Sequence, residues 1–399
     1  GAVQTVMSLC AGTDENVIGQ IERAVEESSR KGYRTIAVAR SEADDFDKLV
    51  FAGLLLLADP PRPDSGNMIE EAKRLGIKPM MLTGDNIAIA KEIAREVGIG
   101  SAVISLAEIK DLPEDAQIRR VGESDGLAEI YPEDKFRIVK LLQSRGHIVG
   151  MTGDGVNDAP ALKQAEMGIA VSNSADVAKA AASVVLTEPG MGVIIDAITI
   201  SRQTYQRMLS WVINKVTKVI EFVGLLTLSF LWLGDIVLSL LGMSLLVFAN
   251  DFVTMSLATD NAAPTSNPNK WSVKNITMAC LVPGILLIAE GMVVMLIGIH
   301  YFHLEWEKLR TLVMLNLIFN SQFRVLIVRE RRHFWSSLPG RELLLLSSAT
   351  IVIFTLLGIH GIIVPPLEAH QVFAVLAFSA LFTLAIDFPK FYVFRKFGL

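Results

Sequence analysis

Six long apolar runs fill the second half of the sequence, and they constrain the fold more than any other feature of the chain. A helix that crosses the hydrocarbon core of a bilayer needs about 20 apolar residues. Six stretches meet this requirement, at roughly 210–232, 236–258, 276–299, 311–329, 343–363 and 371–388. The sequence therefore predicts a transmembrane domain of six helices over residues 206–399, and an even number of spans returns the chain to its starting side.

Basic residues gather in the connections after the second, fourth and sixth runs. These residues are Lys270, Lys274, Arg329, Arg331, Arg332, Arg341, Lys390, Arg395 and Lys396. The three connections would share one side of the membrane, and short loops rich in lysine and arginine stay on the cytoplasmic side. We therefore expect an integral membrane protein whose preceding half is cytoplasmic.

Charged side chains within the apolar runs indicate a function or an ion pair, because each costs about 2.5 to 3.5 kcal/mol at a helix centre. Asp251 follows Asn250 in the second run and has no basic neighbour there, which favours a role in transport. Lys218 and Glu221 lie three residues apart in the first run, where they either neutralise each other or take part in transport. Glu290 in the third run is a further buried carboxylate, either a packing partner or a transport group.

The composition excludes several classes of protein. The 399 residues are 51% hydrophobic and 20% charged, which indicates a soluble part joined to a membrane part. The net charge is -5 and no basic domain is present, so we expect no nucleic-acid partner. The two cysteines, Cys10 and Cys280, lie in different halves and support neither a disulfide framework nor a cysteine metal site.

Residues 45–205 alternate short apolar stretches with amphipathic segments, a pattern typical of βαβ units and a parallel sheet. Strands are expected at Leu54–Leu57, Lys78–Leu82 and His147–Met151, and helices at Asn67–Leu75, Ile87–Val97 and Lys135–Gln143. Ligands of such sheets bind at the carboxyl ends of the strands. Polar clusters begin at two of these ends, at Thr83 and at Thr152.

The two clusters contain the groups that a phosphoryl-transfer site needs. Asp154 and Asp158 lie four residues apart among glycines and suit Mg²⁺, which takes one or two protein carboxylates together with phosphate oxygens and water. Thr83 offers a hydroxyl and Gly84 a backbone amide to a phosphoryl oxygen. Lys135 adds a positive charge near the start of a helix. Phosphoryl transfer depends mainly on such positioning and charge neutralisation.

Four motifs in this region resemble those of the P-type ATPases in order and spacing. They are Asp59-Pro60-Pro61-Arg62, Thr83-Gly84-Asp85-Asn86, Pro132-Glu133-Asp134-Lys135 and the run Met151–Pro160. The resemblance covers nearly the whole chain. It implies a haloacid-dehalogenase-like Rossmannoid phosphorylation domain at 45–205, preceded at 1–44 by the remnant of a nucleotide-binding domain and followed by the membrane domain.

The resemblance also implies roles for individual residues. The catalytic residues would be Thr83, Gly84, Asp85, Lys135, Asp154, Asn157 and Asp158. Among them, Thr83 would hold the phosphoryl group, Lys135 would neutralise it, and Asp154 would bind Mg²⁺ together with Asp158. ATP would be the substrate, with Asp59, Arg62 and Gly84 on the nucleotide side.

The sequence departs from the family's pattern in one important respect. P-type ATPases phosphorylate the aspartate of an Asp-Lys-Thr-Gly-Thr motif, and this sequence contains no such run and no Thr-Gly-Glu loop. We therefore expect the chain to be the C-terminal part of a pump, inactive without the N-terminal part. We also expect its sheet to lack a strand beside the one that precedes Asp154. Two alternatives remain: a non-catalytic membrane scaffold or regulator, and a haloacid-dehalogenase-like phosphatase with a membrane anchor.

The transported ion is indicated by the membrane residues. Asn250-Asp251 and Ser321-Gln322 resemble the plasma-membrane proton pumps, in which one membrane carboxylate carries the proton. The resemblance implies a location in the plasma membrane and a transport site formed by Asp251, Asn250, Glu221 and Lys218. Proton pumps tend to carry an arginine near the last two positions, so a pump for calcium, sodium, potassium or magnesium remains an alternative.

Overall fold

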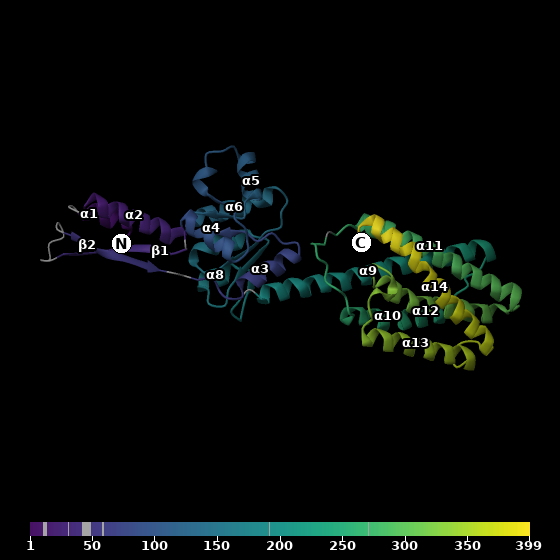
Figure 1. Cartoon of the computed structure of the whole chain (residues 1–399). Helices are drawn as coiled ribbons and strands as arrows, with labels where there is room; N and C mark the ends of the chain where they lie inside the picture. Colours follow the sequence, from purple (N-terminus) through teal and green to yellow (C-terminus); the bar gives the residue numbers. More distant parts are fainter. Residues whose placement is uncertain (11–13, 31, 42–48, 58–59, 191, 270) are drawn as a thin grey trace. The chain divides into compact units, whose positions relative to one another are not determined.

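The computed structural model of the chain describes residues 1–10, 14–30, 32–41, 49–57, 60–190, 192–269 and 271–399. The chain forms two compact units, Gly1–Ile198 and Thr199–Leu399 (Figure 1). The finer division expected at 1–44, 45–205 and 206–399 stays a prediction.

The first unit begins with two helices and an antiparallel hairpin. The helices are α1 (Val3–Leu9) and α2 (Glu15–Arg30), and the strands are β1 (Arg34–Ser41) and β2 (Leu49–Leu57). The strand expected at Leu54–Leu57 lies in this hairpin, so its assignment to the parallel sheet was wrong. The two strands follow one another closely in the chain, and a short connection suits antiparallel pairing, whereas parallel pairing needs a long crossover.

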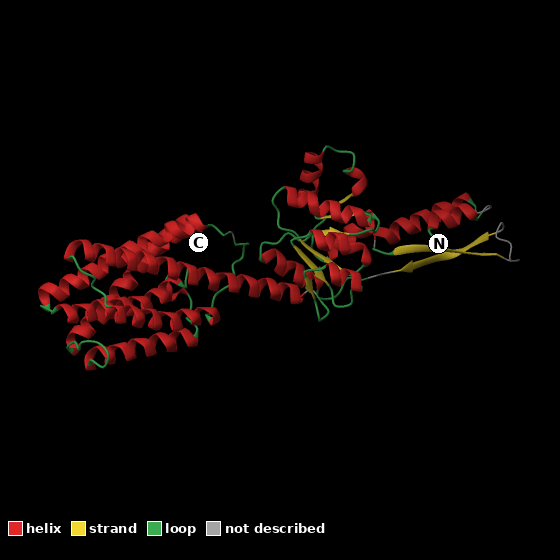
Figure 2. Cartoon of the chain, turned by 180° about the vertical axis from the view of Figure 1, so that it is seen from behind, coloured by secondary structure: helices red, strands yellow, loops and turns green. Residues whose placement is uncertain are grey.

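The rest of this unit is built from two parallel three-stranded sheets with helices between the strands (Figure 2). Their strand orders are β3 (Met81–Leu82), β5 (Gly126–Ala128), β4 (Val103–Ser105), and β6 (Gly150–Gly153), β7 (Met167–Ala170), β8 (Val184–Val185). The helices are α3 (Ser65–Arg74), α4 (Ile87–Glu96), α5 (Glu114–Glu123), α6 (Pro132–Ser144), α7 (Ala159–Gln164) and α8 (Asp176–Ala181). The three helices expected in this region are confirmed as α3, α4 and α6.

The strands β3 and β6 are each an edge of their sheet. No ladder joins them among the described residues, although Leu82 of β3 packs on the hydrophobic cluster that contains Met151 of β6. The expected single sheet is therefore present as two halves whose facing strands are unpaired. The expectation that a strand beside β6 is absent from this sequence stays a prediction.

Six helices of the described chain are long and apolar enough to cross a membrane, as the sequence predicts. They are α9 (Gly192–Leu233), α10 (Leu240–Met255) with its 3₁₀ extension to Thr259, α11 (Val273–Leu296) with a π-helical end at Ile297–Tyr301, α12 (Trp306–Val328), α13 (Arg341–His360) and α14 (Ala369–Phe397). Helix α12 is the most buried of them and contacts α10, α11, α13 and α14. It forms the centre of the second unit.

Several basic residues that the sequence places at the membrane boundary are bonded inside this unit. Lys390 is fully buried and its Nζ donates to the carbonyl oxygens of Ile327 (2.8 Å), Glu330 (2.9 Å) and Arg332 (2.7 Å). The Arg331 guanidinium donates to the Val328 carbonyl at 2.7 Å, and burial lowers its pKa to about 10. These side chains thus bind carbonyl groups that α12 leaves free at its C-terminus and carbonyl groups of the segment that follows it.

Candidate functional site

The loop after β3 is held by its own side chains. The Thr83 hydroxyl donates to Asp85 Oδ2 at 2.8 Å and accepts from the Asp85 backbone N–H at 3.1 Å. Asn86 caps α4 by accepting from the Ala88 N–H at 2.9 Å. Gly84 and Asp85 are exposed. The structure therefore gathers the three predicted residues of this motif on one solvent-facing turn.

A residue that the sequence reasoning missed supports this turn from the end of β5. Glu129 has a positive φ of 58°, and its Oε1 accepts from the Asn86 side chain at 3.2 Å while its Oε2 accepts from the Ser105 hydroxyl at 2.7 Å. It thus connects the loops that follow three adjacent strands. Its only signal in the sequence is a lone acidic residue directly after the buried stretch 126–128.

Asp158 is a buried residue that holds the loop after β6 in place. It is only 5% exposed, and its Oδ1 accepts from Lys135 Nζ at 2.7 Å. Its Oδ2 faces the backbone N–H groups of Asp154 (3.3 Å) and Gly155 (3.4 Å). Both carboxylate oxygens are therefore engaged in positioning Lys135 and the loop. The expected role of Asp158 as a Mg²⁺ ligand stays a prediction.

Asp154 presents a carboxylate that is free for a ligand. The residue is exposed at the carboxyl end of β6, and its side chain makes no hydrogen bond or ion pair to the described residues. One accessible carboxylate suits Mg²⁺, which keeps several waters and uses few protein ligands. Asn157 is exposed nearby and lines a shallow pocket of about 350 Å³ with Pro132 and Glu133 of α6. The residues present thus fit a bound Mg²⁺.

The two loops lie at equivalent ends of strands that share one hydrophobic cluster, since Leu82 immediately precedes Thr83 and packs with Met151 of β6. Asp59 lies outside the described residues. Arg62 is exposed, and its backbone carbonyl accepts from the Ser65 N–H at 3.0 Å. The structure does not bring Arg62 to either loop.

In the second unit, the predicted transport pair of neighbouring residues is divided between two faces of α10. Asn250 is buried and donates to the Leu246 carbonyl at 2.9 Å, whereas the Asp251 side chain is 53% exposed. Successive residues of a helix point in directions about 100° apart, which explains the division. The roles of Asn250 and Asp251 in transport stay predictions.

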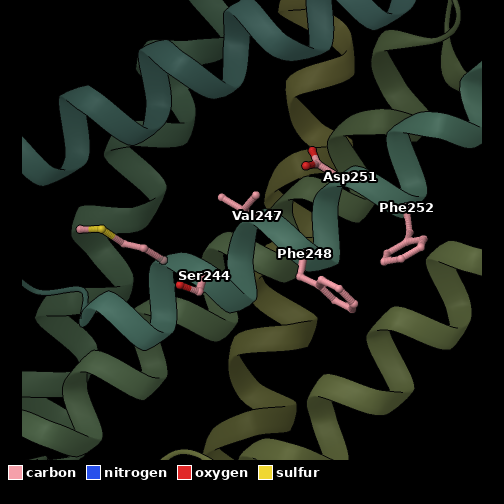
Figure 3. Close-up of a pocket in the computed structure, with 6 residues that line it drawn as sticks. Ser244, Val247, Phe248, Asp251 and Phe252 are labelled. Carbon is pink, nitrogen blue, oxygen red and sulfur yellow. The ribbon is translucent and has the colours of Figure 1, made fainter.

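Asp251 lies on a shallow pocket of about 540 Å³ along α10 (Figure 3). Its partner is Lys215 of α9, with 3.0 Å between Nζ and Oδ1. The sequence reasoning missed Lys215, although it precedes Lys218 by three residues and so shares its side of the helix.

Glu221 is paired differently from the local ion pair that its spacing permits. Arg324 of α12 donates to Glu221, and both side chains are almost fully buried. Arg324 also donates to Asn214 Oδ1 at 3.0 Å. No ion pair joins Glu221 to Lys218 in the described structure, so the alternative in which these two side chains neutralise each other is wrong. A buried carboxylate pairs with the guanidinium that the central helix supplies, because their mutual attraction offsets part of the cost of removing each charge from water.

The parallel-sheet core with its charged loops defines the first unit as a haloacid-dehalogenase-like hydrolase domain. Two sequence models of haloacid-dehalogenase-like hydrolases match this chain, one over residues 15–166 and the other over residues 136–198. Six helices that are long and apolar enough to cross a membrane follow this domain in the described chain. The protein therefore belongs among membrane proteins that carry a haloacid-dehalogenase-like domain.

Whole-chain comparisons identify the family. The chain is 37% identical over 374 residues to a protein of Methanocaldococcus jannaschii named as a cation-transporting ATPase, covering 92% of this chain and 46% of that protein. It is 33% identical to plasma membrane ATPase 1 of Saccharomyces cerevisiae (87% and 38% covered) and to the plasma membrane ATPase of Kluyveromyces lactis (85% and 38%). The chain belongs to the P-type ATPase family, and it spans less than half the length of each of these relatives.

Proposed function

We propose that this chain is the C-terminal part of an ATP-driven P-type cation pump that exports protons across the plasma membrane. The observation that carries the proposal is the loop at the carboxyl end of β6, where Asp158 holds Lys135 at 2.7 Å and leaves Asp154 free. Membrane helices with buried charges follow in the same chain. The names of the relatives support ion transport.

In the proposed phosphoryl-transfer site, different residues of the first unit bind the phosphoryl group, Mg²⁺ and ATP. The Thr83 hydroxyl and the exposed Gly84 amide would orient the phosphoryl oxygens, and Lys135 would neutralise their charge. Asp154 would hold Mg²⁺ together with Asn157 and Asp158, and the ion supplies charge stabilisation for the transferred group. Arg62 and Asp59 would contact ATP.

The aspartate that accepts the phosphoryl group in P-type ATPases does not occur in a matching motif of this sequence. We therefore propose that activity requires the remaining part of the pump, and that this chain alone is inactive. The same observation favours a second candidate function, a membrane scaffold or regulator that binds Mg²⁺ or nucleotide without turnover.

Phosphoenzyme formation tests the proposed chemistry. In a complete pump that contains this chain, Asp154→Ala should abolish the acid-stable phosphoenzyme formed from labelled ATP. Asp176→Ala is the matched control, because Asp176 is a fully exposed carboxylate on α8. Normal phosphorylation of Asp154→Ala would contradict the Mg²⁺ role. A hydroxylamine-sensitive labelled band from the isolated chain would contradict its inactivity.

Transport assays test the proton assignment. We propose that Asp251 loads and releases the ion, with Asn250, Glu221 and Lys218 shaping its surroundings. Asp251→Asn should abolish vesicle acidification while ATP and Mg²⁺ still bind. Acidification at the parental rate by Asp251→Asn, with Glu221→Gln or Glu290→Gln inactive, would show that the carrier lies elsewhere. ATP-driven uptake of a metal cation without acidification would favour the pump for another ion.

A further inference from the structure

A network of buried polar side chains surrounds Asn320 at the centre of the six-helix unit. Its amide nitrogen donates to Glu290 of α11 and, at 3.3 Å, to Glu221 Oε1 of α9. Its amide oxygen accepts from the Thr383 hydroxyl of α14 at 3.2 Å. Asn320, Glu290 and Thr383 are fully buried. Four helices thus contribute to one site that water does not reach.

The two carboxylates of this network, Glu221 and Glu290, differ in how many of their oxygens accept a hydrogen bond. Glu221 accepts from both Arg324 and Asn320, so each of its oxygens has a hydrogen bond. Among the described residues, Glu290 accepts from Asn320 through Oε2, and its Oε1 has no hydrogen-bond partner. The Ser379 hydroxyl beside Glu290 donates to Asn316 Oδ1 at 2.8 Å. An unpartnered oxygen on a fully buried carboxylate is costly if the group is charged.

The charges around Glu290 do not balance if every group is ionised. The charged groups that act on it are Glu221 and Arg324, and the single guanidinium is already bonded to Glu221. Two other charged pairs lie on the packed helices, Lys215 with Asp251 and Lys390 with Asp387 at 2.7 Å. Lys218 of α9 is half-buried and bonds to neither glutamate in the described structure. One negative charge would remain uncompensated at Glu290.

We infer that Glu290 is a buried proton-binding site that holds its proton at neutral pH, as the neutral carboxylic acid. A proton from hydronium binds a carboxylate oxygen of Glu290 and leaves water behind, and release reverses this step. The protonated glutamate, together with the Glu221 and Arg324 pair, gives a network with no net charge.

The same geometry favours a proton over a metal ion. Hard cations need about six oxygen ligands, and Mg²⁺ or Ca²⁺ would have to collect them from this network. Here the amide of Asn320 and the guanidinium of Arg324 direct N–H donors at the carboxylates, and the described residues contain no group of three or more His, Cys, Asp or Glu that could hold a metal. One proton requires only the oxygen that is free.

All the residues of the proton-binding site at Glu290 belong to the six-helix unit. A part for Glu290 in ion transport rests on the proposed function, in which it would be a second acid beside Asp251, and unlike Asp251 it is completely enclosed by protein. The test below is independent of ATP and of transport, so its failure can be distinguished from failure of the pump proposal.

Infrared spectroscopy of the lipid-reconstituted full chain tests the inference. At neutral pH the wild-type chain should show the carbonyl stretch of a protonated carboxylic acid, with a shift in D₂O. Glu290→Gln should lose this band completely. Glu307→Gln is the matched control, since Glu307 is an exposed carboxylate on α12 and its removal should leave the band unchanged. Asp251→Asn should also retain it.

Two outcomes would overturn the assignment. They are the absence of the band from the wild-type chain at neutral pH, and its persistence in Glu290→Gln. If Glu290→Gln does not fold, Glu290→Asp keeps a carboxyl group on a shorter side chain and should move the band without abolishing it. An unmoved band in Glu290→Asp would assign the proton to another residue. The wild-type band should disappear as the pH rises, and a band that persists throughout the alkaline titration would contradict exchangeable proton binding.

Discussion

The two units handle charge in opposite ways. In the first, Thr83 bonds to Asp85 only two residues away, and Asp154 stays exposed without a side-chain partner among the described residues. In the second, Glu221 and Arg324 are 103 residues apart in sequence and almost fully buried. Water can solvate an unpaired group in the first unit, whereas the second must supply every partner from protein. Loss of a charge should therefore affect chemistry in one unit and stability in the other.

The largest expected effect on stability is at Arg324. Arg324→Gln leaves Glu221 buried without its guanidinium, which should lower the free energy of unfolding by about 3 to 5 kcal/mol. Chemical denaturation of the detergent-solubilised chain measures this change. Arg310→Gln is the control, because the two partners of Arg310, Glu307 and Asp235, are exposed carboxylates, and the change should lower the free energy of unfolding by less than about 1 kcal/mol. An equal loss of unfolding free energy in the two variants would contradict the prediction that buried ion pairs stabilise the protein more than exposed ones.

A smaller effect is expected at Gly153, where the first unit does depend on close packing. A Cβ on Gly153 would lie 2.6 Å from the Asp158 Cβ, whereas one on Gly155 would meet nothing closer than 3.8 Å. Gly153→Ala should therefore displace Asp158 and lower the free energy of unfolding by about 1 to 3 kcal/mol. Gly155→Ala should change it by less than about 0.5 kcal/mol. Unfolding of the same chain followed by circular dichroism distinguishes them, and equal stability of the two variants would contradict the geometry.

The Lys215 and Asp251 pair tests whether a membrane charge can behave like a surface charge. Because the Asp251 side chain is 53% exposed in this unit, a double-mutant cycle with Lys215→Met and Asp251→Asn should give a coupling free energy of only about 0.2 to 1 kcal/mol. Thermal unfolding of the four variants in detergent provides the measurement. A coupling free energy of several kcal/mol would show that the pair behaves as a buried ion pair. It would contradict the prediction that Lys215 and Asp251 behave like surface charges.

The smallest effect is expected at Glu166 and depends on pH. Hydrogen bonds from the Val149 N–H and the Gln143 amide, both 2.9 Å, hold the pKa of this exposed carboxyl below its ordinary value. The stabilisation is present above the pKa of the unfolded chain, about 4.3, and is lost as the pH falls through the lower pKa of the folded state. Glu166→Gln should cost less than about 1 kcal/mol at neutral pH. Unfolding of both forms over a pH series should show the difference shrinking in acid, and a constant difference would contradict this account.

The sequence predicted those features that depend on residues close together in the chain. The six spans follow from uninterrupted apolar length, and α6 begins at Pro132, whose fixed φ and missing N–H suit the first turn of a helix. The loops at Thr83 and Asp154 follow from motifs at strand ends. Each of these features can be read within about twenty residues.

Features that depend on distant residues were missed or wrong. Lys218 has the spacing to pair with Glu221, but the fold supplies Arg324 from another helix. Lys215 and Glu129 acquire their roles only once α10 and the loop after β3 lie beside them. No local periodicity encodes such contacts, because they depend on which helix faces and strand ends the tertiary fold brings together.

The buried Lys390 shows that one basic residue can have one role during membrane insertion and another in the folded protein. During insertion, its charge would help to retain the end of α14 in the cytoplasm. After folding, the same Nζ is bonded to three carbonyl groups, one in the last turn of α12 and two in the segment that follows it, and no longer faces solvent. A count of lysines and arginines at this boundary therefore overstates the attraction of the finished protein for anionic lipid headgroups, to which each accessible basic residue would contribute about 1 kcal/mol.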